Sequence, residues 1–120
     1  MIPAHHLGRV AEQRAAALLI AHGYELLERN YRCRMGELDL VARRGALLVI
    51  VEVRLRTSRA FGGAAASISA SKRRRILLAA RHLLARRPAL ARLRVRFDAV
   101  LLDGEHLPIE WIEGAFDAAT

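Results

Sequence analysis

The chain has 120 residues, of which 53% are hydrophobic and 5% aromatic, and it carries a formal net charge of +8 with a pI near 11.3. This length fits one domain with its own core, and the composition excludes a disordered tail and a low-complexity protein. The positive charge indicates a polyanionic partner, either nucleic acid or an acidic membrane surface, and composition alone does not choose between them.

The first half of the chain predicts one helix followed by three strands. Apolar residues recur at helical spacing over residues 6–22, and Gly23 supplies the left-handed residue at which helices commonly end. Three apolar or alternating segments follow, separated by short turns, and each predicts a strand: residues 24–31, 37–43 and 47–55. Short turns join antiparallel neighbours, so these strands should form a meander. The last of them is apolar on both faces until Glu52, which is typical of a central strand.

The second half of the chain predicts a loop, a helix and two strands. The Gly-, Ala- and Ser-rich residues 58–69 are expected to form a loop. A helix then begins at Ser69 or Ser71, whose hydroxyls can cap it, and runs to about Arg87. The last two segments predict strands joined through the hairpin dipeptide Asp103-Gly104: residues 92–102 and 106–113.

The order α-β-β-β-α-β-β predicts an α/β fold in which helices flank a mixed central sheet, within a single domain spanning residues 1–120. The helix between the third and fourth strands permits a parallel crossover there. Cys33 is the only cysteine, which excludes an intramolecular disulfide and fits a reducing compartment. The sequence has no run of 18 apolar residues and no signal-peptide pattern, so we expect a cytoplasmic protein without a membrane partner.

Two apolar strands each carry one carboxylate, Asp39 and Glu52. Burying an unpaired carboxylate costs several kcal/mol, so each acid needs a cation, a metal or a structural partner. Glu52 and Arg54 project from one face of their strand, and an antiparallel neighbour could bring Asp39 to the same surface. Two converging carboxylates suit Mg²⁺, which can polarise a phosphodiester. The alternative interpretation is structural, with both acids paired to Arg54, Arg56 or Arg34.

Further charged residues are candidates beside these acids. Glu12, off the apolar stripe of the first helix, either adds a carboxylate to the site or is an ordinary solvated residue. Four consecutive cations open the second helix, at the end that favours anions, and indicate either a phosphate clamp or a solvated face. Asp98 either pairs with an arginine beside the site or lies solvated at an edge. The predicted nucleic-acid-binding residues are Lys72, Arg73, Arg74, Arg75 and Arg56.

Seven motifs in order along the chain carry a family resemblance: Ala11-Glu12, Asn30-Tyr31-Arg32-Cys33-Arg34, Gly36-Glu37-Leu38-Asp39-Leu40, Val51-Glu52-Val53-Arg54-Leu55-Arg56, Phe61-Gly62-Gly63-Ala64-Ala65, Ser71-Lys72 and Arg96-Phe97-Asp98. With these motifs the chain resembles the YraN-like family of small bacterial proteins, within the PD-(D/E)xK nuclease-like superfamily. The resemblance implies a restriction-endonuclease-like core, similar to that of archaeal Holliday-junction resolvases.

The resemblance also implies roles for single residues. Asp39 and Glu52 match the metal-binding acids, and Glu12 matches the acid of the first helix. Arg54 stands where the nuclease pattern has lysine, and Lys72 matches a basic position that follows the core motif. The implied activity is a Mg²⁺- or Mn²⁺-dependent endonuclease acting on DNA, on branched or single-stranded forms.

The arginine at position 54 changes what this site can do. A guanidinium keeps its proton at working pH, so Arg54 cannot be a general base, although it can hold a phosphate through two hydrogen bonds. One alternative is therefore a non-catalytic nucleic-acid-binding module in which Arg54 neutralises Glu52. Another is an interaction scaffold that uses a sheet edge or the Trp111 region to recruit a partner or a second copy of the chain, so a homodimer stays open.

Overall fold

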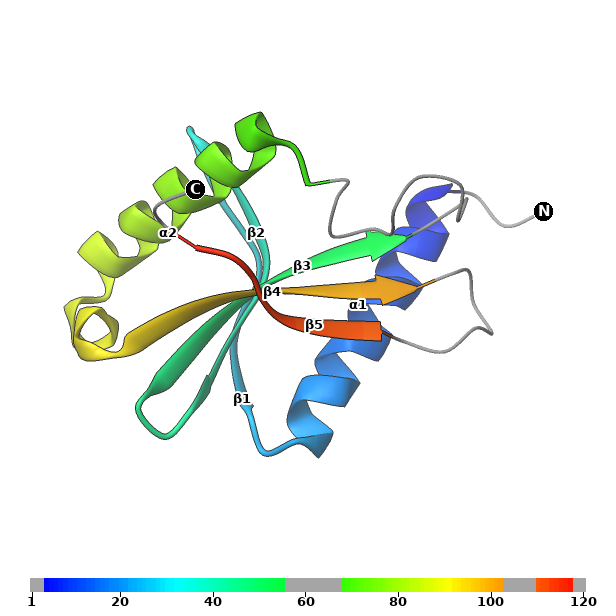
Figure 1. Ribbon diagram of the computed structural model, residues 1–120, viewed down its shortest axis with the longest axis horizontal. Coiled ribbons are helices and arrows are strands. Elements are labelled where there is room, and N and C mark those ends of the chain that lie inside the picture. The colour runs from blue at the N-terminus through cyan, green and yellow to red at the C-terminus, as the bar shows by residue number, and fades with distance from the viewer. Residues whose placement is uncertain (1–3, 56–67, 103–109, 118–120) are drawn as a thin grey trace.

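The structure, a computed structural model, describes residues 4–55, 68–102 and 110–117. Its elements in chain order are α1 (Ala4–Ala21), β1 (Glu25–Cys33), β2 (Gly36–Arg44), β3 (Leu47–Leu55), α2 (Ala70–Arg86), the short 3-10 helix η2 (Pro88–Arg92), β4 (Arg94–Leu102) and β5 (Glu110–Phe116) (Figure 1). The predicted order of helices and strands is confirmed, and so is the α/β fold. The hairpin dipeptide Asp103-Gly104, most of the predicted loop 58–69 and Arg56 lie outside the described residues.

The five strands form one mixed sheet in the order β1-β2-β3-β4-β5. Strands β1, β2 and β3 form the predicted antiparallel meander, and β5 returns antiparallel to β4. Strands β3 and β4 run parallel, because the chain crosses over through α2 between them. Strand β3 therefore lies at the centre of the sheet, as its apolar pattern predicts.

The two long helices cover opposite faces of this sheet (Figure 1). Leu48 and Ile50 of β3 belong to the core on the α2 side, and the alternate residues Val49 and Val51 belong to the core on the α1 side. Strand residues two apart share a face, so Glu52 projects toward α2. The Glu52 side chain therefore points toward the basic first turn of α2.

The bounds of the last two strands differ from those predicted. Residues 88–92 form η2, so β4 begins at Arg94 and not at residue 92. Strand β5 continues to Phe116, beyond the predicted end at residue 113. Gly114 takes a φ of 61°, which only glycine adopts readily, close to an irregularity in the pairing of β4 with β5. The glycine therefore allows the strand to continue where its sequence suggested an end.

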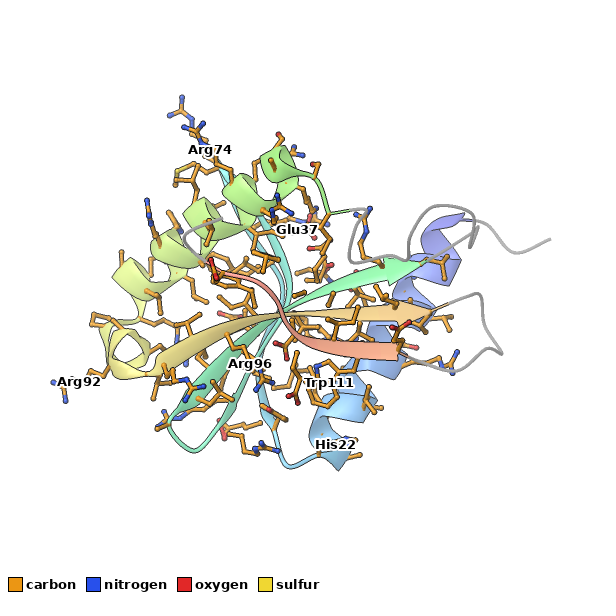
Figure 2. The ribbon with its side chains drawn as sticks, in the orientation of Figure 1. His22, Glu37, Arg74, Arg92, Arg96 and Trp111 are labelled. Carbon is orange, nitrogen blue, oxygen red and sulfur yellow. The ribbon has the colours of Figure 1, made fainter. Side chains whose placement is uncertain are left out.

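Asp98 is completely buried and holds β4 to its neighbours. Its two carboxylate oxygens accept hydrogen bonds of 2.8 Å from Arg96, and they also accept bonds from the Trp111 indole (2.9 Å) and the Gly114 backbone N–H (3.0 Å). Arg96 in turn donates to the hydroxyl of Tyr24 at 3.2 Å. Figure 2 shows Arg96 and Trp111 near each other, just below β4 and β5 in this view. Asp98 therefore pairs with an arginine, in a network that joins β4, β5 and Tyr24, the residue before β1.

Gly36, the first residue of β2, lies directly against the backbone of α2. A Cβ atom at this position would lie 2.6 Å from the carbonyl oxygen of Arg75, which is closer than real Cβ atoms approach. Because the obstacle is backbone, it cannot turn aside as the end of a side chain can. The glycine thus allows the β1–β2 turn and the first turns of α2 to pack in contact.

We expect Gly36→Ala to lower the free energy of unfolding by about 1–3 kcal/mol, because the added methyl group must push α2 away from β2. Urea denaturation followed by circular dichroism measures this change. Gly8→Ala is the matched control, since a Cβ at Gly8 in α1 meets nothing within 4 Å. That control should leave the protein as stable or more stable by up to about 1 kcal/mol. Equal stability of the two variants would contradict the close packing at Gly36.

Candidate functional site

Asp39 and Glu52 meet where two neighbouring strands separate. The antiparallel pairing of β2 with β3 ends at Leu40 and Val51. One residue before Leu40 on β2, Oδ2 of Asp39 accepts a hydrogen bond of 2.9 Å from the backbone N–H of Val53. The side chain thereby takes the place of the next ladder bond and fixes the carboxylate beside Glu52. The predicted convergence of the two acids is thus present in the structure.

The environment of these acids raises the pKa of both. Burial raises the pKa of Glu52 from 4.5 to about 7, and the neighbouring Asp39 carboxylate adds to the rise. Burial also raises the pKa of Asp39, although its hydrogen bond from Val53 opposes this effect. Glu52 is only 5% exposed, so water does little to screen the repulsion between the two carboxylates. A cation bound between them would relieve that repulsion.

Two cationic side chains lie beside Glu52. Nζ of Lys72 is 3.6 Å from Oε1 of Glu52, and Nη1 of Arg54 is 3.9 Å from the same oxygen. Both lower the pKa of Glu52, but less than burial and Asp39 raise it. Arg54 reaches the carboxylate along its own strand, whereas Lys72 comes from the first turn of α2. The site therefore combines two carboxylates with an amine and a guanidinium.

Two more acids act on Asp39 from its surroundings. The carboxylates of Glu12 on α1 and Glu37 on β2 both raise the pKa of Asp39 by charge repulsion. Glu12 is half-buried, and its charge acts on Asp39 from α1. Glu37 also forms an exposed ion pair with Arg32 at 3.5 Å, and its effect on Asp39 was not predicted. Negative charge is thus concentrated around the start of β2.

The raised pKa of Glu52 makes stability depend on pH. Its pKa is about 7 in the folded protein and near 4.5 in the unfolded chain, so between these values the folded protein holds a proton that the unfolded chain has released. The stabilising contribution is complete below pH 4.5 and is lost as the pH rises through about 7. We expect the free energy of unfolding in EDTA to fall by roughly 2–3 kcal/mol over that range.

Urea denaturation at a series of pH values checks this dependence. Glu52→Gln should remove most of the decrease, because the amide does not titrate, whereas Glu28→Gln at the surface of β1 should retain it. If the wild-type curve is flat in EDTA from pH 5 to 8, Glu52 does not have the raised pKa.

The donor set fits a hard divalent cation. Among the residues that the structure describes, no group of three or more His, Cys, Asp or Glu side chains is arranged around one point. A metal at this site would rely on the carboxylates of Asp39 and Glu52, on water and on substrate oxygens. Mg²⁺ commonly binds in this way, through one or two carboxylates with several waters retained. The residues present are therefore consistent with Mg²⁺ or Mn²⁺ and do not suit a zinc site.

The basic start of α2 divides into residues with different surroundings. Lys72 faces the acid pair, and Arg73 donates a hydrogen bond of 3.2 Å to the carbonyl of Ile68. Arg74 and Arg75 are exposed, and Figure 2 shows Arg74 pointing away from the body of the protein. The helix is capped by Ser69, whose hydroxyl accepts from the backbone N–H of residue 72 at 3.0 Å. One of the two predicted caps is thus identified.

In the ranges described, no helix is long and apolar enough to cross a membrane.

The nearness of Lys72 to Glu52 is the part of the site that the sequence did not predict. Twenty positions separate the two residues in numbering, and only the packing of α2 on the sheet brings them together. The four consecutive cations at the start of α2 indicated cationic surroundings, but they did not indicate which cation reaches the acids.

Comparison with known proteins places the chain among bacterial relatives. The sequence profile of the uncharacterised protein family UPF0102 matches residues 11–102. A UPF0102 protein of Dechloromonas aromatica is 55% identical over 111 residues, which cover 92% of this chain and 88% of the relative. One from Nitrosospira multiformis is 54% identical, with 92% of each chain covered, and one from Nitrosomonas europaea is 50% identical, with 98% of each covered. The chain therefore belongs to the UPF0102 family, which is the YraN-like family that its motifs resemble.

Proposed function

We propose that the protein is a Mg²⁺- or Mn²⁺-dependent endonuclease that hydrolyses phosphodiester bonds in branched or single-stranded DNA. One observation carries the proposal: the carboxylates of buried Glu52 and half-buried Asp39 converge, and the pKa of each is raised. Such an arrangement costs stability in the absence of a bound cation. Structural acids are normally neutralised by their partners, whereas here the pKa of Glu52 stays near 7 despite two cations. Perturbed acids of this kind are concentrated at functional sites.

Each residue of the site has a chemical role in this proposal. A divalent ion held by Asp39 and Glu52 would polarise the scissile phosphate and lower the pKa of a bound water. Arg54 contributes a fixed positive charge that can hold a phosphate oxygen and stabilise charge in the transition state. Glu12 adds negative charge to the cation site through its effect on Asp39. The cytoplasm, where bacterial DNA lies, is the compartment we propose for this reaction.

Lys72 supplies the group that Arg54 cannot. It is the only lysine of the chain, and its amine lies 3.6 Å from the Glu52 carboxylate. An amine can exchange a proton, whereas a guanidinium keeps its proton at working pH. We therefore propose that Lys72 of α2 takes the role of the lysine that the nuclease pattern has at position 54 of β3.

We expect Lys72→Arg to reduce cleavage by about 100-fold, the lower end of what a general acid or base contributes. The substitution keeps the positive charge, so binding of DNA should change by less than about threefold. Initial cleavage rates over a pH series, together with binding in EDTA, measure both quantities. Unchanged cleavage would exclude proton transfer by Lys72, and Arg81→Lys on the same helix is the control for the exchange of these side chains.

The experiment that tests the function compares DNA forms and metals. Purified protein is incubated with plasmid, single-stranded, flapped and four-way-junction DNA in Mg²⁺, in Mn²⁺ and in EDTA. We expect cutting of at least one branched or single-stranded form in Mg²⁺ or Mn²⁺ and none in EDTA. Cutting that persists in EDTA would remove the metal from the proposal. No cutting of any form under any condition would remove the nuclease activity.

The ion pairs of Glu52 favour one alternative function. Arg54 and Lys72 both lie within 4 Å of its carboxylate, as in a site neutralised without a metal. The protein would then be a non-catalytic nucleic-acid-binding or accessory module. Titration with Mn²⁺ separates the two functions, because only the enzyme needs a cation at the acid pair.

Light scattering of the same samples measures whether the protein is a homodimer, in which two sites could act on the two strands of a duplex.

A further inference from the structure

A cavity of about 370 Å³ lies beside the acid pair, between the β1–β2 turn and the first turns of α2. This volume is within the range of about 300–1,000 Å³ that is usual for small-molecule sites. Lys72 lines the cavity and also contacts Glu52, so the cavity and the acid pair are contiguous. The close contact of Gly36 with the Arg75 backbone fixes the two walls against each other.

The charge of this cavity is strongly positive. Four cations line it, and the only carboxylate among its lining residues is that of Glu37, which pairs with Arg32. Lys72 is shared with Glu52. Within the described part of the chain, Arg34 and Arg75 have no ion-pair partner, and both are exposed. Two guanidinium groups are therefore available to an anion that enters the cavity.

Part of the cavity wall is apolar. Ile76 is buried, Cys33 is half-buried and Met35, at the β1–β2 turn, is 41% exposed although it is a large hydrophobic residue. An inorganic phosphate would use the guanidinium groups and leave this wall without a partner. A nucleotide has both a phosphate for the cations and a base whose flat faces are apolar. Its dimensions also fit the volume better than those of a single phosphate ion.

We propose that this cavity binds one nucleotide of a DNA strand, adjacent to the phosphate that the acid pair holds. The inference rests on the proposed function, because it identifies the occupant as part of the same substrate. Arg34 and Arg75 bind the phosphate, and Met35 and Ile76 contact the base. Through Lys72 the two sites share a cation, so the bound nucleotide sets the position of its neighbour at Asp39 and Glu52.

Cys33 provides a direct probe of occupancy, because it is the only cysteine and it lines the cavity. The experiment measures the rate of Cys33 alkylation by iodoacetamide in EDTA, with and without a single-stranded oligonucleotide at saturating concentration. We expect the oligonucleotide to slow alkylation at least about fivefold. The Arg34→Glu/Arg75→Glu double variant should lose this protection and bind the oligonucleotide at least about tenfold more weakly, because each charge-assisted hydrogen bond contributes about 1.5–3 kcal/mol.

Controls identify the bound group and the place of binding. The Arg81→Glu/Arg86→Glu double variant makes the same change of charge on exposed positions of α2 outside the cavity, and it should keep the protection of Cys33. Inorganic phosphate at the same ionic strength should protect Cys33 much less than the oligonucleotide. Equal protection by inorganic phosphate would overturn the nucleotide assignment, and so would protection that persists when Arg34 and Arg75 are reversed in charge.

The result is independent of catalysis, because alkylation is measured without metal. Protection of Cys33 in a protein that cleaves no DNA would support the cavity and overturn the nuclease activity. Metal-dependent cleavage by a protein whose Cys33 is not protected would support the activity and overturn the cavity. Far-ultraviolet circular dichroism of both double variants confirms that the exposed substitutions leave the fold intact.

Discussion

Asp39→Asn is expected to reduce metal-dependent cleavage at least about 1,000-fold, because a metal contributes several kcal/mol to the stabilisation of the transition state. The asparagine side chain has the same shape, and its oxygen can still accept the hydrogen bond from the backbone N–H of Val53. The fork between β2 and β3 should therefore persist. What the substitution removes is one of the two charges that hold the cation.

Three measurements separate this effect from a loss of structure. Cleavage rates in Mg²⁺ and Mn²⁺ should fall to background, while the unfolding transition stays cooperative and DNA binding in EDTA is equal to wild type or tighter. Glu28→Gln is the matched control, because it removes a carboxylate from an exposed ion pair with Arg87, and it should cleave normally. Cleavage that survives in Asp39→Asn would exclude the proposed metal site.

Asp98→Ala is expected to destabilise the protein by about 3–5 kcal/mol, the usual consequence of removing one partner from a buried ion pair. The carboxylate is fully buried and accepts four hydrogen bonds, two of them from Arg96. Without it, the Trp111 indole N–H and the Gly114 N–H lose their acceptor, and Arg96 keeps only the exposed Glu113 carboxylate, 3.6 Å away, as a counter-charge. Urea denaturation followed by Trp111 fluorescence measures the loss, since this is the only tryptophan.

The exposed ion pair between Glu28 and Arg87 gives the comparison for this effect. The two side chains are 4.0 Å apart at the surface, and removing Glu28 should cost less than about 1 kcal/mol. A similar small cost for Asp98→Ala would mean that water reaches the buried network. A double variant that replaces Arg96 as well as Asp98, with apolar side chains, should recover part of the lost stability, because no unpaired charge is then left inside.

The sequence predicted the sheet well, because residues close together in the chain determine its strands and turns. Residues 47–55 form β3 with the predicted bounds, because a short apolar run bounded by turns commonly forms a buried strand. The convergence of Asp39 and Glu52 followed from the antiparallel turn at Gly45, which adopts the left-handed φ of 59°. Pairing across a short turn fixes the register, and the register fixes which side chains are neighbours.

Contacts between elements far apart in sequence were not predictable in this way. The sequence left open whether Asp98 lies solvated at an edge or pairs with an arginine, because alternation with Arg94 and Arg96 resembles a surface strand. The structure resolves this through Trp111 and Gly114, which come from another strand. The position of Lys72 depends likewise on how α2 packs across the sheet. The angle at which a helix packs across a sheet cannot be predicted from a local sequence pattern.

The parallel pairing of β3 with β4 has a consequence for the order in which the chain folds. Arg44 and Leu47 of the β2–β3 hairpin pair across two residues, whereas Leu47 of β3 pairs with Arg94 of β4. Closing the longer loop costs more chain entropy, so we expect the hairpin to form before the crossover. The two acids would then approach each other early, while the cations of α2 arrive only with the crossover. A nascent chain would thus carry its carboxylates together before the lysine that completes the site has docked.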